Sequence, residues 1–370
     1  MKIVIVSAAR VPSDTANSIQ VMKVCQAFAQ LGHEAILLVP GPNPASSDLK
    51  QHYGLTTLFQ VEWLPTRDRR IFPWRAVWRA RALGADLLYA WPVQSAWLSP
   101  LLGIPSMLEM HDYPAGSFGP LWYLLFLRLP GKKRLLPITE ALYRALKGRY
   151  GPMPGGRLVI SPDGVDLERY TALPGPAEAR RACNLPESPT ILCTGHLYEG
   201  RGADLFLALA EKFPRTGFVW VGGRPEEVKH WQEQVIRKKL TNVTFTGFIT
   251  NDRIPLYQAA ADILLMPYGR TISGSSGGDI SRVYSPMKMF EYMAAGRAIL
   301  SSDLPVLREV IDESMAAFCP PEKADAWEIA LGSLLSDPQR RQDLGERARA
   351  AVSKYSWIDR ARRALQGFDE

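Results

Sequence analysis

Short apolar runs alternate with longer amphipathic stretches along the chain. In the stretch 18–31, for example, Val21, Val24 and Phe28 recur on one face at helical spacing. Apolar runs of strand length that alternate with helical patterns are typical of parallel sheets with helices on both faces, so we predict an α/β fold. The predicted strands are Ile3–Val6, Ala35–Val39, Asp86–Ala90, Ser106–Met110 and Leu135–Ile138, then Thr190–Thr194, Phe218–Val221, Val243–Thr246, Asp262–Met266 and Ala298–Ser301.

The alternation is interrupted by a Pro- and Ala-rich segment, "TALPGPAEARRACNLPESP", at 171–189. A chain of 370 residues is long enough for roughly two domains, each with its own core. We interpret the segment as a linker region and predict two doubly wound, Rossmann-like domains, 1–168 and 169–355. A last helical pattern at 356–370 follows the second sheet, and we expect it to fold back across the first domain.

Composition narrows the class of protein. The chain has 46% hydrophobic and 22% charged residues, as globular proteins do. Its four scattered cysteines predict buried thiols in a reducing compartment rather than disulfides or a zinc site. The N-terminal "MKIVIVSAAR" fits a buried strand better than a signal peptide, and the run "LWYLLFL" at 121–127 is too short to span a membrane. We therefore expect a cytoplasmic protein.

The net charge of +7 favours an anionic partner: phosphate, nucleic acid or a membrane surface. No helix-turn-helix, zinc-finger or RNA-binding signature is present, so nucleic acid is not expected. The stretches 67–83 and 121–136 combine basic residues with Trp and Phe, a composition that suits a membrane interface with anionic lipids. The alternative is a pair of ordinary helices whose cations are solvated.

Parallel sheets bind ligands beyond the carboxyl ends of their strands, so the loops after the strands are the candidate sites. The first of them, "SAARVPSDTANS" at 7–18, ends in a helix start where Ala16 and Asn17 leave room for a phosphate. It lacks G-x-G-x-x-G, which argues against nicotinamide binding. The alternative is that Ser18 only caps the helix.

The loop "EMHDYP" at 109–114 places His111 at a strand end, where a histidine can make a polar contact or transfer a proton. A structural histidine bonded to the backbone is the alternative. The chain contains no G-x-S-x-G, so a serine hydrolase is not favoured.

The loop "GHLYEGRGADLFLALA" at 195–210 joins glycines, the cations His196 and Arg201, and a helix start. These are the ingredients of a diphosphate site, although G-x-x-x-x-G-K-[ST] is absent. An ordinary turn with a surface arginine is the alternative. Glycines let the backbone approach a flat group such as a base; those of interest here are Gly195, Gly222 and Gly247, the last followed by Phe248.

The segment "SGSSGGDISRVYSPMKMFEYMAAG" at 273–296 begins as a small-residue loop that we expect to be mobile. Pro286 suits a first helical turn, which would direct the amides of Met287 and Lys288 toward an anion. Glu291 lies about one turn further and could accept two ribose hydroxyls. A helix start followed by an acid predicts a nucleotide site; the alternative is that Glu291 pairs with an arginine.

Taken together, these motifs resemble those of the retaining GT-B glycosyltransferases of family 4 (glycosyl transferases group 1), and the resemblance covers nearly the whole chain. The resemblance implies two Rossmann-like domains facing each other across a cleft, with an N-terminal acceptor domain and a C-terminal donor domain. It rests on the order of "ANSIQVMKVCQAFAQLGHEAILLVP", "EMHDYP", "ITEALYRAL", "SPDGVDLERY", "GHLYEGRG", "NVTFTGFI", "SPMKMFEYMAAGRAILSSDLPVLREV" and a closing "YSW" helix.

The resemblance also implies roles for single residues. His111 would line the site of the transferred sugar, Arg201 would match the family's phosphate-binding lysine, and Glu291 would hold the ribose. His196 would match an arginine of the family, "DGVD" at 163–166 would mark the turn into the interdomain linker, and "SP" (Ser285, Pro286) opens the donor-binding helix.

The sequence departs from the family at the glutamate pair E-x7-E, because Val283 stands in the first position and leaves only Glu291. Asp279 or Ser281 is a candidate substitute.

The implied reaction moves a hexose from a UDP- or GDP-sugar to a glycan or lipid-linked acceptor at the inner face of a membrane. It uses His111, Arg201 and Lys288, without a metal or a cofactor. The alternatives are a sugar-nucleotide epimerase of the same fold and a non-catalytic binding protein for nucleotide sugars.

Overall fold

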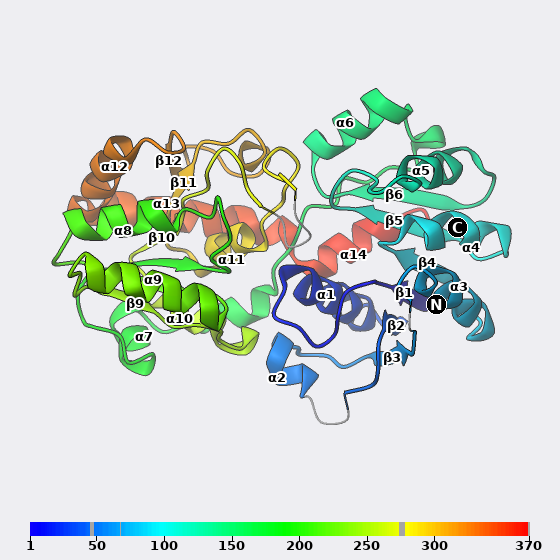
Figure 1. Cartoon of the computed structure of the whole chain (residues 1–370), viewed down its shortest axis with the longest axis horizontal. Coiled ribbons are helices and arrows are strands. Elements are labelled where there is room, and N and C mark those ends of the chain that lie inside the picture. Colours follow the sequence, from blue (N-terminus) through cyan, green and yellow to red (C-terminus); the bar gives the residue numbers. More distant parts are fainter. Residues whose placement is uncertain (45–47, 67, 274–277, 369–370) are drawn as a thin grey trace. The chain divides into compact units, whose positions relative to one another are not determined.

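The computed structural model describes residues 1–44, 48–66, 68–273 and 278–368. They form two compact units (Figure 1). The first contains Met1–Asp163, Val283–Ser285 and the chain from Trp357 onward, and the second contains Gly164–Arg282 and Pro286–Ser356. The chain therefore passes between units at Asp163, earlier than the expected boundary after residue 168. The segment 171–189 is not a linker, because it lies inside the second unit.

The first unit is built on a six-stranded parallel sheet of order β3-β2-β1-β4-β5-β6. Its four central strands are buried almost completely, and the apolar side chains of the sheet pack against the surrounding helices. The strands are β1 (Lys2–Val6), β2 (Glu34–Pro40), β3 (Gln60–Leu64), β4 (Leu87–Ala90), β5 (Ser106–Met110) and β6 (Lys133–Pro137). The helices are α1 (Ala16–Gln30), α2 (Leu49–Tyr53), α3 (Phe72–Ala82), α4 (Val93–Leu101), α5 (Gly119–Arg128), α6 (Glu140–Tyr150), the short 3-10 turn η1 (Pro154–Gly156) and α14 (Trp357–Leu365).

The second unit repeats this plan with a six-stranded parallel sheet of order β12-β11-β10-β7-β8-β9. Its strands are β7 (Thr190–Thr194), β8 (Gly217–Val221), β9 (Val243–Phe245), β10 (Ile263–Met266), β11 (Ala298–Ser302) and β12 (Ala316–Cys319). Its helices are α7 (Pro176–Ala182), α8 (Ala203–Lys212), α9 (Pro225–Arg237), α10 (Ile254–Ala259), α11 (Met287–Ala295), α12 (Ala324–Ser336) and α13 (Pro338–Ala351), with 3-10 turns η2 (Leu167–Tyr170), η3 (Asn251–Arg253), η4 (Leu307–Glu309) and η5 (Val352–Tyr355).

The predicted α/β class with two doubly wound sheets is confirmed, and every predicted strand is present within a few residues. Two strands were not predicted, β3 and β12, and each lies at an edge of its sheet. The sequence of β3, "QVEWL", is only partly buried, and that of β12, "AAFC", is short and rich in small residues. Neither has the long apolar run that marks a strand buried on both faces.

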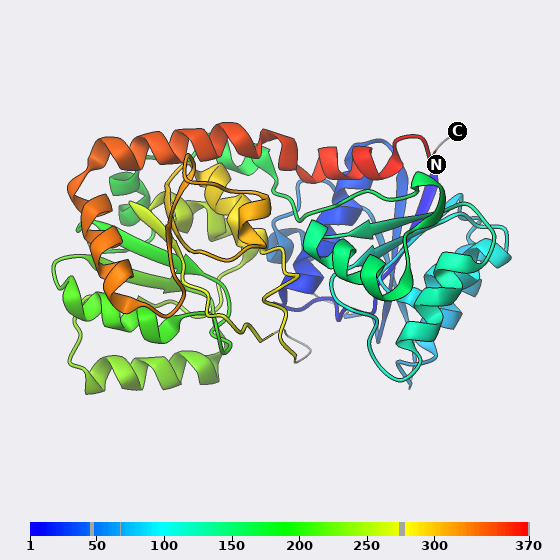
Figure 2. The same cartoon turned by 90° about the horizontal axis from the view of Figure 1, so that it is seen from above.

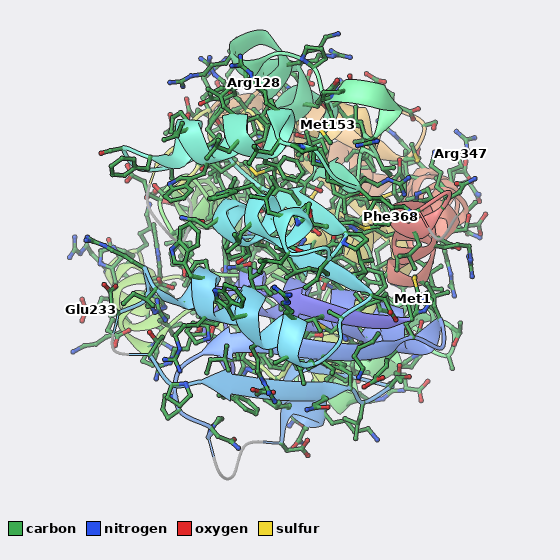
Figure 3. The ribbon with its side chains drawn as sticks, turned by 90° about the vertical axis from the view of Figure 1, so that its right-hand side faces the viewer. Met1, Arg128, Met153, Glu233, Arg347 and Phe368 are labelled. Atoms are coloured by element: carbon green, nitrogen blue, oxygen red, sulfur yellow. The ribbon has the colours of Figure 1, made fainter. Side chains whose placement is uncertain are left out.

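The closing helix of the chain, α14, belongs to the first unit, where it packs against α1 (Figure 2). Its buried positions recur at helical spacing and include one cation, Arg360, among apolar residues. Phe368 follows the helix (Figure 3). The guanidinium carbon of Arg134 lies 5.0 Å from the centroid of the Phe368 ring. Within the described residues, no helix is long and apolar enough to cross a membrane.

Candidate functional site

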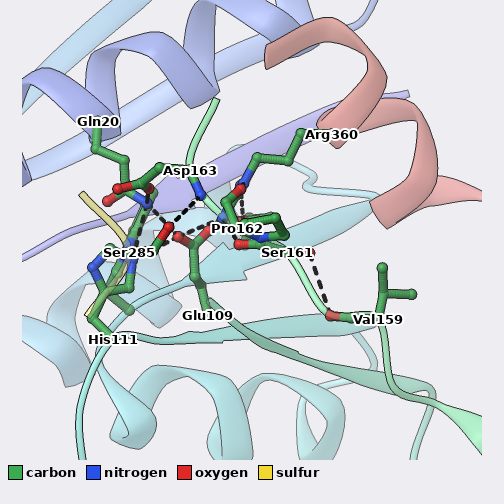
Figure 4. Close-up of polar contacts among 11 residues, drawn as sticks. Gln20, Glu109, His111, Val159, Ser161, Pro162, Asp163, Ser285 and Arg360 are labelled. Carbon is green, nitrogen blue, oxygen red and sulfur yellow. Dashed lines mark hydrogen bonds and ion pairs between the residues drawn. The ribbon is translucent and has the colours of Figure 1, made fainter. Parts of the chain in front are cut away.

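A group of polar side chains lies inside the first unit at the carboxyl ends of β4 and β5. We call it the polar cluster: Gln20, Glu109, His111, Asp163 and Arg360 (Figure 4). The Gln20 amide nitrogen lies 2.6 Å from Glu109 Oε1, 2.9 Å from Asp163 Oδ1 and 3.0 Å from His111 Nε2. These residues come from four parts of the chain, namely α1, β5 with the loop after it, the segment between η1 and η2, and α14.

Arg360 reaches the cluster from α14 and is almost completely buried. One of its terminal nitrogens lies 2.7 Å from Glu109 Oε1 and donates to the Ser161 oxygen at 3.1 Å. The guanidinium also donates to the Pro162 oxygen at 2.8 Å and to the Tyr89 hydroxyl at 3.1 Å. Because a buried guanidinium needs partners for most of its N–H groups, this network explains how the interior accommodates it.

The two carboxylates of the cluster have opposite pKa shifts. Burial alone would raise the pKa of Glu109, but the charge of Arg360 and the hydrogen bond with His111 prevail and lower it to about 2. At Asp163 burial prevails over the charges of His111 and Arg360 and raises the pKa to about 6. The cluster therefore holds one carboxylate that is ionised at any physiological pH and one that titrates just below neutrality.

His111 lies directly after β5, at the strand end where the sequence predicted it. Its partners are side chains rather than the backbone, so the alternative of a backbone-bonded histidine is wrong. Sequence reasoning missed Gln20 and Arg360. The only signal was that each is a polar residue on the buried face of a helix whose neighbours on that face are mostly apolar.

A pair of cations shares one aromatic ring in the second unit. The Lys288 ammonium lies 5.1 Å from the centroid of the Tyr268 ring, and the guanidinium carbon of Arg201 lies 5.6 Å from it. Lys288 Nζ also lies 3.6 Å from Cys193 Sγ at the end of β7, where burial raises the pKa of the thiol and keeps it neutral. Among the described residues, Lys288 has no carboxylate within ion-pair distance. An anion can therefore engage Lys288 without displacing an acidic partner.

The predicted glycines of the second unit are neighbours in space. The Gly195 amide donates to the Val221 oxygen at 2.8 Å, and the Gly222 amide donates to the Gly247 oxygen at 3.0 Å. A Cβ on Gly222 would lie 2.7 Å from the Gly195 oxygen, so a side chain there would collide with the next loop. The residues that directly follow β7 and β8 and the second residue after β9 are thus joined through their backbones.

Gly202, at the start of α8, has φ +84°, and a Cβ there would lie 1.8 Å from the Pro267 oxygen. The equivalent distance at Gly200, to the Thr271 oxygen, is 2.0 Å. These two glycines let the loop that carries Arg201 pack against the segment that carries Tyr268.

Helix α11 begins at Met287, followed by Lys288. The sequence predicted Pro286 in the first helical turn. In the structure Pro286 instead precedes the helix, with φ −79° and ψ 120°. Glu291 lies one turn further and accepts a hydrogen bond from the Gln258 amide nitrogen at 3.0 Å. The side-chain oxygen of Gln258 in turn accepts a hydrogen bond from the Tyr170 hydroxyl at 2.7 Å, which fixes the orientation of the side-chain amide.

Three other predicted donor-binding residues lie in loops of the second unit. His196 stacks on Tyr198, with ring centroids 4.9 Å apart, and Phe248 follows Gly247 with 45% of its surface exposed. Asp279 Oδ1 accepts from the amides of Ile272 and Ser281, each at 3.0 Å, and these bonds lower its pKa. Asp279 thus organises its own loop; residues 274–277, in the part predicted to be mobile, lie outside the described residues.

Val283 and Ser285, near the E-x7-E position, belong to the first unit. Val283 is buried in the hydrophobic core of that unit, and its backbone oxygen accepts from the Thr139 hydroxyl at 3.0 Å. The Ser285 hydroxyl accepts from the Asp163 amide at 3.1 Å. The valine that replaces the first glutamate of the pair therefore has a packing role in this chain.

Ala16 and Asn17 are the exposed first residues of α1. Ser18 is not the N-cap that sequence reasoning offered as an alternative, because Thr15 occupies that position and accepts from the Ser18 amide at 3.4 Å. The Ser18 hydroxyl instead lies 2.7 Å from the hydroxyl of Tyr53.

The basic stretch 121–136 is only partly at the surface, which corrects the sequence prediction. Lys133 is buried and donates to the Phe126 and Leu129 oxygens, and Arg134 is buried and donates to the Ala364 oxygen. In the other stretch, 67–83, residue 67 lies outside the described residues. Among the described residues, no group of three or more His, Cys, Asp or Glu side chains is arranged to hold a metal ion.

Comparison with protein families gives two matches, which together span most of the chain. Residues 18–169 match the model described as "Glycosyltransferase Family 4", and residues 188–337 match the one described as "Glycosyl transferases group 1". Each match falls mainly within one of the two units.

Among characterised relatives, the chain is 26% identical over 222 residues to a GDP-mannose-dependent alpha-(1-6)-phosphatidylinositol monomannoside mannosyltransferase of Mycolicibacterium smegmatis, covering 58% of this chain and 56% of the relative. It is 24% identical over 345 residues to a 2-deoxystreptamine N-acetyl-D-glucosaminyltransferase of Streptomyces fradiae, covering 85% and 76%. The mannosyltransferase matches thus cover only about half the length of those relatives.

Among solved structures, Anabaena Alr3699/HepE in complex with UDP superposes with a TM-score of 0.76 at 15% identity and full coverage of both chains. WaaG, described as a glycosyltransferase involved in lipopolysaccharide biosynthesis, gives 0.70 at 16% identity with 99% of both chains covered. At these identities the likeness establishes the fold of the chain.

Proposed function

Because the chain belongs to the group 1, family 4 glycosyltransferases, we propose that it moves a sugar from a nucleotide-diphosphate sugar to an acceptor hydroxyl with retention of configuration. The observation that carries this proposal is Lys288, the second residue of α11, which has no carboxylate within ion-pair distance among the described residues and shares the Tyr268 ring with Arg201. Two cations and helix amides beyond a parallel sheet suit a diphosphate.

In the proposed reaction, the acceptor oxygen forms a bond to the anomeric carbon as the bond from that carbon to the diphosphate oxygen breaks. The hydroxyl proton passes to the departing diphosphate. Arg201 and Lys288 stabilise the charge that grows on this leaving group. Glu291 would accept ribose hydroxyls, and the Gly195, Gly222 and Gly247 backbone would meet the base.

The donor is expected to be a UDP- or GDP-sugar. One relative is named as GDP-mannose-dependent, and HepE has been solved with UDP and with UDP-glucose. We assign the acceptor to the first unit, where the His111 side chain is 30% exposed and would contact the reacting sugar.

A lipid-linked acceptor is supported by exposed apolar side chains on the first unit. Ile71 and Trp78, before and on α3, are 51% and 56% exposed, and Phe118 and Leu121, at the start of α5, are 64% and 51% exposed. Exposed arginines accompany them, among them Arg128 at the end of α5 (Figure 3). Apolar and basic groups on one unit suit a membrane that contains anionic lipids.

The test is a screen of UDP-, GDP- and ADP-sugars for a rise in melting temperature and for diphosphate release, with and without lipid extract and added metal. We expect one donor to bind and its turnover to depend on the acceptor extract. Lys288→Met should abolish turnover, whereas Lys238→Met, which removes an exposed lysine paired with Glu211 in the same unit, should not.

Other outcomes of the screen would contradict the proposal. Interconversion of sugar nucleotides without an acceptor would indicate an epimerase, and binding without turnover across acceptor extracts would indicate a binding protein. If no nucleotide sugar binds, the assignments of Lys288, Arg201 and Glu291 are wrong.

A further inference from the structure

We propose that Glu109, held by Arg360, is a positioning residue that keeps a proton on Nε2 of His111 and leaves Nδ1 to accept a hydrogen bond from the substrate. The role of Nδ1 toward a sugar hydroxyl rests on the proposed function. The position of the proton is a property of the chain alone and can be measured without a substrate.

Glu109 Oε1 and His111 Nε2 form a short contact of 2.7 Å. Two atoms that both lack hydrogen would repel each other at this distance, so one of them must carry a proton. Arg360 contacts the same carboxylate oxygen at 2.7 Å, and the Tyr89 hydroxyl donates to the other oxygen. A carboxylate with these donors is ionised, which places the proton on Nε2 of the histidine.

Two neutral donors oppose this arrangement. Trp91 Nε1 lies 3.1 Å from His111 Nε2, and the Gln20 amide nitrogen lies 3.0 Å from it; both would favour an unprotonated nitrogen. The two amide hydrogens of Gln20 have closer acceptors in Glu109, at 2.6 Å, and Asp163, at 2.9 Å. Only Trp91 remains, and a neutral bond of 3.1 Å is weaker than a charge-assisted bond of 2.7 Å.

The other ring nitrogen of His111, Nδ1, is left available as an acceptor. Within the described chain, Nδ1 of His111 has no hydrogen-bond partner, and the side chain is 30% exposed. A neutral ring with its proton on Nε2 has a lone pair on Nδ1, which can accept from a hydroxyl group.

Arg360 is the second part of this arrangement. Without its charge, burial favours the neutral acid at Glu109, which could donate its own proton to Nε2 and so reverse the tautomer of His111. The charged and titratable groups around the histidine are Glu109 on β5, Asp163 after η1 and Arg360 on α14, and Tyr89 on β4 contacts Glu109. One helix at the end of the chain thereby controls a histidine beyond the sheet.

The test is nitrogen NMR of the full chain with ring-labelled histidine, without substrate. The chain has 5 histidines, and the His111 signals are those lost in His111→Asn. We expect wild-type His111 to show protonated Nε2. The charge-balanced variant Glu109→Gln/Arg360→Gln, the paired variant, should shift the proton toward Nδ1, because Trp91 then donates to Nε2 and no carboxylate competes for that nitrogen.

A matched control is Glu62→Gln/Arg79→Gln, which removes an exposed ion pair of the first unit, with a 2.7 Å contact, far from the histidine in sequence. It should leave the His111 signals unchanged, and circular dichroism should show all variants folded. A wild-type ring protonated on Nδ1, or a paired variant that keeps the wild-type tautomer, would overturn the proposal.

An activity measurement separates this inference from the proposed function. With an identified donor, the paired variant should lower kcat by roughly 10- to 100-fold while the donor KM stays within about twofold, because a histidine presented wrongly affects the reaction more than donor binding. Absence of any sugar transfer by the wild type would refute the function but leave the NMR result standing. A paired variant with wild-type kcat would refute the positioning role.

Discussion

Replacing Asp163 with asparagine should stabilise the first unit at neutral pH. The Asp163 carboxylate is buried, and its hydrogen bond with a described side chain comes from the neutral amide of Gln20 at 2.9 Å. Burial raises its pKa from 3.8 to about 6, so folding is opposed by ionisation above that pH. An asparagine keeps an oxygen for Gln20 and carries no charge.

The size of the effect follows from proton linkage. The folded state binds the Asp163 proton more tightly than the unfolded state, so the contribution of this group to stability is greatest below pH 3.8 and is lost as the pH rises to about 6. A shift of about two pH units corresponds to about 3 kcal/mol, which Asp163→Asn should restore at pH 7. Glu109 acts in the opposite direction, since its pKa of about 2 gives stability that is lost only as the pH falls from about 4.5 toward 2.

The assay is urea unfolding at pH 4.5, 6 and 7.5, read by hydrogen exchange of peptides from β5 and α14 because a chain with two units need not unfold in one step. The variant should gain stability over the wild type at pH 7.5 and little at pH 4.5. The exposed carboxylate of Asp252 provides a control, and Asp252→Asn should change neither value. An Asp163→Asn protein no more stable than the wild type at pH 7.5 would refute the reasoning.

Three further predictions follow from single contacts. Arg360→Met should destabilise the first unit by about 3–5 kcal/mol because it leaves Glu109 buried without a cation, and Glu109→Gln added to it should recover most of the loss in urea unfolding. Gly202→Ala should lower the free energy of unfolding by about 2–4 kcal/mol, because its φ is +84° and a Cβ would collide with a backbone oxygen. Gly84 has φ +67° but open space around it, so Gly84→Ala should lower the free energy of unfolding less in the same assay. Tyr268→Leu should weaken UDP or GDP binding about 3- to 30-fold in calorimetry through loss of the shared ring, and Tyr268→Phe should not; equal affinities for the two variants would remove the ring from the site.

The fold was largely predictable because most strands of both sheets are buried on both faces. Such strands are near-continuous apolar runs, and their alternation with amphipathic helices fixes the class. The edge strands β3 and β12 were missed because an edge strand needs fewer apolar residues. Their position depends on pairing with a neighbouring strand, which the local sequence does not encode.

The candidate site was predictable only where topology determines it. His111 follows a strand, so its place beyond the carboxyl ends of the strands could be inferred from the rule for parallel sheets. Gln20 is 91 residues away from it in sequence, and Arg360 reaches Tyr89 across 271 residues. Contacts of this range depend on how helices pack. Among the arginines of α14, the helical period alone marks Arg360 as buried, and it does not name the partner.

The pair formed by Glu109 and Arg360 is a poor choice if stability alone is considered. Removing two charges from water is unfavourable, and apolar residues of similar volume often serve a fold as well or better. Asp163 adds a carboxylate whose ionisation opposes folding near neutral pH. These three side chains nevertheless lie together beside His111, a histidine with an exposed edge at the end of a parallel strand. Two apolar residues in place of Glu109 and Arg360 would bury the same surface but would leave Trp91 as the partner of His111 Nε2. The ring would then present a donor at Nδ1 rather than an acceptor.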